Sequence, residues 1–144
     1  MNYNFILIPL IAGLFAQTIK LLIKSNEKKF NLKNMAAYSG MPSGHSAMVA
    51  SMTTTIGLYE GLESPIFALA FVFALIVIRD ALGLRQYLGQ HGHFLNILVN
   101  DLAEDKMLDE QYPKMTEKIG HTPIQVTAGL LIGIGVSVLA YYIL

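Results

Sequence analysis

Long apolar runs separated by short polar segments dominate the pattern of this chain. Four of the runs approach the roughly 20 residues that a helix needs to cross a bilayer. They extend from Phe5 to Ile23, from His45 to about Leu62, from Pro65 to about Leu82 and from Pro123 to Leu144. The pattern therefore predicts an all-α integral membrane helical bundle with about four transmembrane helices, formed by a single domain over residues 1–144.

The second and fourth runs differ in what they offer a neighbouring helix. The second is rich in serine, threonine and glycine, which suits a helix that faces the interior of a bundle. The fourth carries no charge, and its Gly129, Gly133 and Gly135 would allow another helix to approach closely.

The segment after the third run has another periodicity. Its apolar residues recur at helical spacing from Leu84 to Val99, which predicts an interfacial amphipathic helix, on the membrane surface or packed on the bundle. Acidic residues and then Pro113 follow, which indicates a solvated face or loop.

The composition is typical of a membrane protein, and it also bears on the partners and metal sites that the chain could have. Hydrophobic residues make up 53% of the chain and charged residues only 14%, whereas soluble domains carry about a quarter. The formal net charge is zero, so nothing indicates a nucleic acid partner. Cysteine is absent, which excludes disulfides and thiolate metal sites.

Basic residues predict the orientation in the cell membrane. They are concentrated in the loop after the first run and in the segment after the third, so both regions are expected in the cytoplasm. The start of the second helix, the end of the third and the start of the fourth then lie on one face. Six side chains can meet there: Lys20, His45, Arg79, Asp80, Arg85 and His121.

The first motif that carries chemistry is Pro42-Ser43-Gly44-His45. Ser43 can cap the following helix, and Gly44 lets a ligand approach the backbone closely. Because a helix N-terminus offers free N–H groups and a positive dipole end, it suits a phosphate, with His45 in reach as a proton donor. The alternative is a plain helix cap with a histidine at the interface.

A second motif, Gly120-His121-Thr122-Pro123, has the same character. Thr122 is a good N-cap, Pro123 occupies the first helical position, and Gln125 completes a capping box. His121 immediately precedes the cap, where its imidazole could attack a phosphorus atom. The alternative is an ordinary histidine in a loop.

Charged residues at the end of the third run form the next candidate. Arg85 or Arg79 could clamp phosphate oxygens, and Asp80 could orient the arginine or a histidine. Lys20 could add positive charge. The alternatives are snorkelling, a local Arg79–Asp80 contact and a lysine that only anchors its helix. His91-Gly92-His93 could suggest a metal pair, but it lacks a third ligand nearby and is interpreted as a surface turn.

Three motifs together resemble the divergent PAP2 family, which is related to acid phosphatases and vanadium-dependent haloperoxidases. They are Pro42-Ser43-Gly44-His45-Ser46-Ala47, Asp80-Ala81-x-Gly83-x-Arg85 and Gly120-His121-Thr122-Pro123. The resemblance covers nearly the whole chain and implies a PAP2-like bundle. It implies that His45 protonates the leaving group, that His121 forms a phosphohistidine and that Ser43 and Gly44 bind the phosphate. No metal or cofactor is needed by that mechanism.

The chain departs from ordinary PAP2 enzymes in three respects. They carry a Ser-Arg pair before the second histidine, where this chain has Met115 and Thr116, so Arg85 or Arg79 would replace that arginine. They carry an aspartate four residues after that histidine, where this chain has Gln125, and Asp80 is the candidate substitute. PAP2 cores also usually have six helices, so the amphipathic helix, or a second copy of the chain in a homo-oligomer, would complete the bundle.

These observations support a leading hypothesis and two others. The leading one is a membrane phosphatase for a lipid phosphomonoester or pyrophosphate, such as phosphatidate, phosphatidylglycerophosphate or a polyprenyl pyrophosphate. Its phosphate would contact Ser43, Gly44, Lys20, Gln125 and the arginines. The second is a catalytically silent membrane protein that binds lipid phosphate or a partner at the same site. The third is a magnesium-dependent lipid enzyme that uses Asp101, Asp105 and Asp109.

Overall fold

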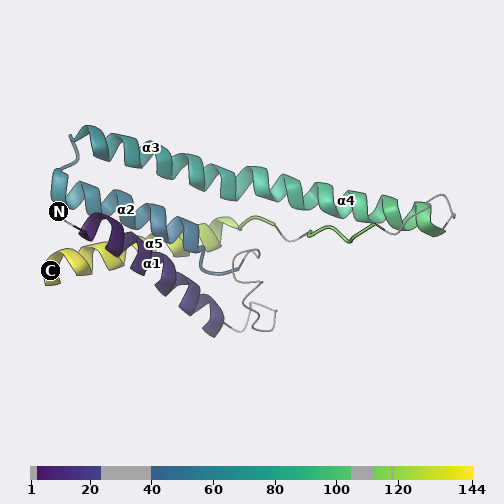
Figure 1. The fold of residues 1–144 in the computed structure, drawn as a ribbon, viewed down its shortest axis with the longest axis horizontal. Helices are drawn as coiled ribbons and strands as arrows, with labels where there is room; N and C mark the ends of the chain where they lie inside the picture. The colour runs from purple at the N-terminus through teal and green to yellow at the C-terminus, as the bar shows by residue number, and fades with distance from the viewer. Residues whose placement is uncertain (1–2, 24–39, 105–111, 118) are drawn as a thin grey trace.

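A computed structural model describes residues 3–23, 40–104, 112–117 and 119–144, and all regular structure in these ranges is helical. The elements, in chain order, are α1 (Asn4–Leu22), α2 (Gly44–Glu60), α3 (Pro65–Arg79), the π-helical turn η2 (Asp80–Leu84), α4 (Arg85–Glu104) and α5 (Pro123–Ile143). Figure 1 shows α1, α2, α3 and α5 gathered in a bundle, from which α4 projects. The predicted all-α membrane bundle is confirmed.

α2 lies at the centre of the bundle, where it packs against α1, α3 and α5, while α1 also packs against α5. The glycines of α5 explain how closely α2 and α5 approach. A Cβ atom at Gly129 would clash with the Ser43 carbonyl oxygen, and one at Gly133 would clash with that of Ala47. By contrast, Gly135 has open space around it. Small residues thus allow two backbones to touch, as in other membrane helix pairs.

A buried hydroxyl cluster joins the same two helices. The Ser137 hydroxyl on α5 lies 2.7 Å from that of Ser51 and 3.1 Å from that of Thr55, both on α2. It also lies 3.0 Å from the Ser51 carbonyl oxygen, to which it can donate. Because these groups satisfy one another, the polar residues of α2 can be buried within an apolar bundle.

Three of the described helices are long and apolar enough to cross a membrane: Asn4–Leu22, the continuous helix Pro65–Glu104, and Pro123–Ile143. α2 has 17 residues and is not among them, although the sequence predicted a span there. Its central position explains its composition, because its sides pack against three other helices. Large side chains of the outer helices, such as Leu14, Leu69 and Leu131, are exposed.

The third apolar run and the amphipathic helix differ from the expectation, because they form one helix of 40 residues. The sequence predicted a span that ends near Leu82 and a separate helix on the membrane surface or the bundle. Instead, η2 joins α3 to α4 without a break, and α4 continues away from the bundle (Figure 1). The π-helical turn includes Gly83 and Leu84, and the helix continues through it without a break.

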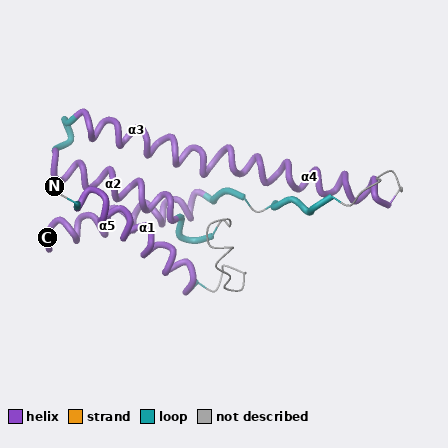
Figure 2. The backbone as a smooth tube through the Cα atoms, in the orientation of Figure 1, coloured by secondary structure: helices purple, strands orange, loops and turns teal. Residues whose placement is uncertain are grey.

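Residues 112–117 and 119–120, the return segment, lead back along α4 towards the bundle in a non-helical conformation (Figure 2). The Asn96 side chain holds this segment at both Met115 backbone groups, donating to the carbonyl oxygen at 2.9 Å and accepting from the N–H at 2.8 Å. A Cβ atom at Gly89 would clash with the Glu117 carbonyl oxygen, and one at Gly92 would lie 3.0 Å from that of Thr116. These glycines therefore let the return segment lie directly against α4.

The two glycines of α5 provide a matched test of this packing. We expect Gly133→Ala to destabilise the fold by about 1–3 kcal/mol, because the added methyl group forces α5 away from α2. Gly135→Ala adds the same methyl group where nothing lies within 4 Å, so it should not lower stability, and the better helix propensity of alanine should raise it slightly. Thermal unfolding in detergent measures both. Equal unfolding temperatures for the two variants would contradict the close α2–α5 contact.

Candidate active site

The backbone of His121 is held by the π-helical turn. In η2 the Arg85 N–H donates to the Asp80 carbonyl, five residues back, and so bypasses Ala81. The Ala81 carbonyl accepts instead from the His121 N–H at 3.0 Å. A widened turn of this kind is frequent at functional sites because it presents a backbone group that a regular α-helix would use internally. Here the Ala81 carbonyl fixes the backbone of His121, the residue before the N-cap of α5.

Gln86 holds His121 from its other side. Its Nε2 donates to the His121 carbonyl oxygen at 2.7 Å. The neighbouring Gly120 has a φ of +95°, and a Cβ atom there would lie 2.8 Å from the Gln86 backbone nitrogen. Only glycine combines this conformation with this close approach. Both backbone polar groups of His121 are thereby satisfied by the helix Pro65–Glu104.

The start of α2 forms the opposite wall of the site. Ser43 is fully buried as the N-cap, and its hydroxyl accepts from the Ser46 N–H at 3.4 Å and from the Ser46 hydroxyl at 2.9 Å. Its own N–H donates to the Gln125 carbonyl at 3.0 Å, which ties α2 to the first turn of α5. The Gly44 and His45 N–H groups begin the helix and have no intrahelical acceptor. They are therefore suited to an anion.

His121 is 8% exposed, and its Nδ1 is buried without a hydrogen-bond partner. Burial lowers the pKa of the imidazole to about 4, and the nearby charges of Lys20, His45 and Arg85 act in the same direction. The imidazole is therefore neutral at physiological pH, which is the form that has a free lone pair.

Side chains from α1, α2, η2, α4 and the loop before α5 come together here: Lys20, His45, Asp80, Arg85 and His121. His45 interacts electrostatically with Arg85, Lys20 and Asp80, as His121 does with Lys20, His45 and Arg85. The sequence predicted that these residues could meet, and the structure brings them to the same end of the bundle. The site holds two positive side chains, Lys20 and Arg85, and one carboxylate, that of Asp80. Its net positive charge favours an anion.

Asp80 and Arg85 form a close ion pair, with Asp80 Oδ2 2.6 Å from Arg85 Nε. Since this contact uses the Nε–H, the two terminal nitrogens of the guanidinium keep donors for an oxyanion. Arg79, by contrast, is exposed at the end of α3, and no ion pair in the described residues includes it. The placement favours Arg85 over Arg79 as the arginine of the site.

Gln125 has the structural role that the sequence indicated. Its side-chain oxygen accepts from the Thr122 N–H at 3.1 Å, and the Thr122 hydroxyl accepts from the Gln125 N–H at 3.4 Å. The predicted capping box is therefore confirmed. The Gln125 side-chain oxygen is turned to the helix end, while the His121 Nδ1 has no partner.

Two glutamines near the site were not predicted. Gln86 lies on the predicted amphipathic helix, and its position next to Arg85 is the signal in the sequence that could have identified it. Gln17 interrupts the first apolar run as a polar residue, and a Cβ atom at Gly44 would lie 2.8 Å from its Nε2. The Gln17 amide therefore lies directly against the start of α2.

The interpretation of His91-Gly92-His93 as a surface turn is wrong, because all three residues lie within α4. His93 Nδ1 lies 2.9 Å from Glu117 Oε2, across to the return segment. Hydrogen bonds from Asn96 and His93 lower the pKa of the Glu117 carboxyl group. No group of three potential metal ligands occurs among the described residues, while Asp105 and Asp109 of the magnesium hypothesis lie outside them.

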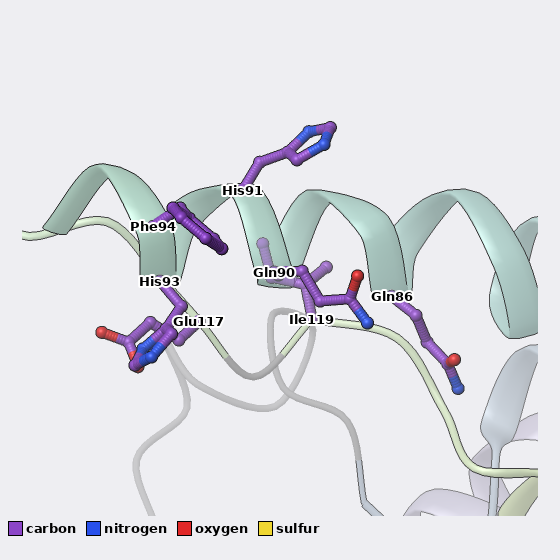
Figure 3. Close-up of a pocket in the computed structure, with 8 residues that line it drawn as sticks. Gln86, Gln90, His91, His93, Phe94, Glu117 and Ile119 are labelled. Carbon is purple, nitrogen blue, oxygen red and sulfur yellow. The ribbon is translucent and has the colours of Figure 1, made fainter. Parts of the chain in front are cut away.

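A groove with a volume of about 620 Å³ lies between α4 and the return segment. Gln86, Gln90, His93, Phe94, Glu117 and Ile119 contribute to its lining (Figure 3). It does not include Lys20, His45 or Arg85, but it shares Gln86 with the candidate site.

Comparisons with known proteins cover almost the whole chain. The family model described as the divergent PAP2 family matches residues 1–136. The chain is also 36% identical over 151 aligned positions to the uncharacterized membrane protein YuiD of Bacillus subtilis (strain 168), covering 96% of each protein. No solved structure matches.

Gln86 and Gln90 allow a test of how His121 is held. We expect Gln86→Met to speed amide hydrogen exchange in peptides that contain Gly120 and His121 by roughly fivefold, because a lost hydrogen bond is worth about 1 kcal/mol. Gln90→Met, one turn further along α4 and exposed, should leave exchange unchanged. Equal exchange in Gln86→Met and wild type would show that Gln86 does not hold the His121 backbone.

The low pKa of His121 predicts how stability depends on pH. The unfolded chain binds a proton at this residue near pH 6.5, whereas the folded chain binds it near pH 4. The unfolded state therefore holds more protons in this window, and stability falls as the pH is lowered through it. Thermal unfolding of wild type and His121→Gln at about pH 7 and pH 4.5 checks this. The wild type should lose more stability on acidification than the variant, and parallel losses would contradict a buried neutral imidazole.

Proposed function

This chain belongs to the divergent PAP2 family, and on that basis we propose that it is a membrane phosphatase that hydrolyses a lipid phosphomonoester or pyrophosphate. One observation carries the proposal: two histidines, an arginine and a lysine converge at the N-terminus of α2. This set combines an anion site with the groups that phosphoryl transfer needs.

Phosphate binding uses groups from α1, α2 and α4, and Asp80 of η2 orients one of them. The Gly44 and His45 N–H groups meet the phosphoryl oxygens at the positive end of α2. The Arg85 guanidinium, oriented through its Nε by Asp80, offers its remaining donors, and Lys20 adds a positive charge from α1. These donors are in place before the substrate arrives, so they stabilise the charge of the transition state at little reorganisation cost.

The first chemical step is attack by the neutral His121 imidazole on phosphorus. A nitrogen–phosphorus bond forms as the bond from phosphorus to the lipid oxygen breaks, and protonated His45 gives its proton to the departing oxygen. His121 suits the role of nucleophile because its burial and the neighbouring positive charges keep it unprotonated. The products are a phosphohistidine and the dephosphorylated lipid.

The second step returns the protein to its starting form. His45, now neutral, accepts a proton from a water molecule whose oxygen attacks the phosphorus. The nitrogen–phosphorus bond breaks, and inorganic phosphate leaves. His45 ends this step protonated, ready for the next substrate. This sequence needs no metal or cofactor.

The substrate class follows from the setting of the site. The site lies at one end of a bundle that includes three helices able to cross a membrane, so the apolar tail of a lipid can lie among them while its phosphate reaches His121. The distribution of basic residues favours a site at the cytoplasmic face of the cell membrane. That side suits the synthesis of glycerophospholipids better than the recycling of an outward-facing carrier, so phosphatidate and phosphatidylglycerophosphate rank ahead of polyprenyl pyrophosphate.

A second candidate function rests on the unpartnered His121 Nδ1. Without a carboxylate at this atom, no fixed negative charge stabilises the cationic imidazole that phosphoryl transfer creates. The same residues would still bind a lipid phosphate. In this alternative the protein binds such a lipid, or a partner that carries phosphate, without turnover.

Phosphate release distinguishes the two functions. Purified protein in detergent is given phosphatidate, phosphatidylglycerophosphate and a polyprenyl pyrophosphate, with a chelator present. We expect release that His121→Gln reduces to background and that His45→Gln and Arg85→Gln reduce at least about 100-fold. Arg79→Gln is the matched control for Arg85→Gln and should retain most of the activity.

Each other result has a definite meaning. Saturable binding of these lipids without release would establish the binding protein and reject the phosphatase. Loss of release on addition of the chelator would instead favour the magnesium-dependent enzyme. Release that survives His121→Gln would contradict the phosphohistidine step.

A further inference from the structure

Gln17 brings a side-chain amide into α1, a helix long and apolar enough to cross a membrane. The amide end of this side chain reaches Gly44 of α2, because a Cβ atom at Gly44 would lie 2.8 Å from Nε2 and 3.2 Å from Cδ. The residue is only partly exposed, and among the residues that the structure describes no hydrogen bond reaches its amide. A polar group in such a helix is costly to keep without a partner, so it points to a function.

The amide lies on the side of Gly44 from which an anion would approach α2. In an α-helix each Cα–Cβ bond is tilted towards the N-terminus. The space that a Cβ atom at Gly44 would fill therefore lies towards the end of α2 whose backbone N–H groups have no intrahelical acceptor. Since the Gln17 amide reaches this space, it adds N–H donors to the end of α2 that already carries those of Gly44 and His45.

Three positions on one face of α1 follow this contact along the helix: Gly13, Gln17 and Lys20. Gly13 packs on α2, because a Cβ atom there would lie 2.9 Å from the Met48 Cε. Lys20 acts electrostatically on both histidines of the candidate site. Residues three or four positions apart share a face of a helix. Gln17 therefore lies between a packing contact with α2 and a charge of the candidate site.

The same contact explains why residue 44 is a glycine. Gly44 begins α2 and is not among the glycines with a positive φ, so its backbone conformation is open to other residues. Glycine also weakens a helix relative to alanine. A Cβ atom at this position, however, would displace the Gln17 amide. Glycine here makes room for that side chain.

We propose that Gln17 binds the substrate, with its amide donating a hydrogen bond to a phosphoryl oxygen at the start of α2. This inference rests on the proposed function for the nature of the ligand, a phosphate group, and does not require turnover. A glutamine amide offers two donors and carries no charge. It therefore adds to anion binding without adding to the positive charge of Lys20 and Arg85, and the bound phosphate gives the amide a partner.

Binding of inorganic phosphate by the purified full chain in detergent tests this role without any catalytic step. Gln17→Met keeps the length of the side chain and removes both donors. Because hydrogen bonds to charged groups are the strong ones, we expect the dissociation constant for phosphate to rise at least about tenfold. Thr18→Val is the matched control and should leave it unchanged, because Thr18 is exposed and its hydroxyl donates to the Leu14 carbonyl of the same helix.

Thermal unfolding separates binding from packing. Without phosphate, Gln17→Met should unfold no earlier than wild type, because the amide has no hydrogen bond to lose. Added phosphate should raise the unfolding temperature of wild type more than that of the variant. Gln17→Glu, which has nearly the same shape, should bind phosphate more weakly still, because its carboxylate repels the anion. A Gln17→Met protein that binds phosphate as tightly as wild type would overturn the proposal.

The contact between Gln17 and Gly44 gives a second test. Gly44→Ala should weaken phosphate binding, because the added methyl group displaces the amide. In a Gln17→Ala background no amide remains to be displaced, so the same methyl group should change the affinity by at most about twofold. Equal losses in both backgrounds would contradict the placement of the amide at Gly44, and the proposal would fail with it.

Phosphate release from lipids, measured on the same proteins, keeps this proposal apart from the phosphatase. If wild type releases phosphate and Gln17→Met binds inorganic phosphate normally, the role of Gln17 fails and the phosphatase stands. If wild type releases none while Gln17→Met loses affinity for inorganic phosphate, the role of Gln17 is supported and the phosphatase is rejected. Wild type that binds no inorganic phosphate would overturn the role of Gln17 whatever the lipid assay gives.

Discussion

The hydrogen bond from the His121 N–H to the Ala81 carbonyl is the contact on which the geometry of the site depends. It exists because η2 widens one turn of a long helix and leaves that carbonyl without its α-helical donor. Together with the hydrogen bond from Gln86 to the His121 carbonyl, it joins the helix Pro65–Glu104 to the residues that precede α5. A regular α-helix over the same residues would satisfy its own carbonyl groups, and the His121 N–H would lose this acceptor.

The second constraint is the close approach of α2 and α5. Gly129 and Gly133 allow the backbones to touch, and the Gln125 carbonyl accepts from the Ser43 N–H at the end of that contact. This contact therefore fixes the position of the α2 N-terminus relative to His121. Positive charge from Lys20 and Arg85 then lies near the buried imidazole of His121. This charge favours an incoming anion and keeps the imidazole neutral.

Much of this arrangement could be predicted from the sequence because it is local. Apolar runs gave the helices, and the caps at Ser43 and Thr122 followed from residues within one turn of each helix start. The predicted topology of the membrane spans placed Lys20, His45 and Arg85 at the same end of the bundle. The π-helical turn, the unbroken helix through Gly83 and the return segment could not be predicted in the same way. Each depends on contacts between residues far apart in sequence, such as Asn96 with Met115, and a glycine alone does not reveal what approaches it.

The most direct test of the account is to identify the atom that carries the phosphoryl group during turnover. Protein mixed with a lipid phosphate labelled on phosphorus is quenched within one turnover in alkali, which preserves phosphohistidine, and digested for mass spectrometry. The account predicts a labelled peptide that carries the phosphoryl group on His121, and no label in His121→Gln. Release of phosphate with the label on another residue, or with no labelled protein at any time, would contradict it.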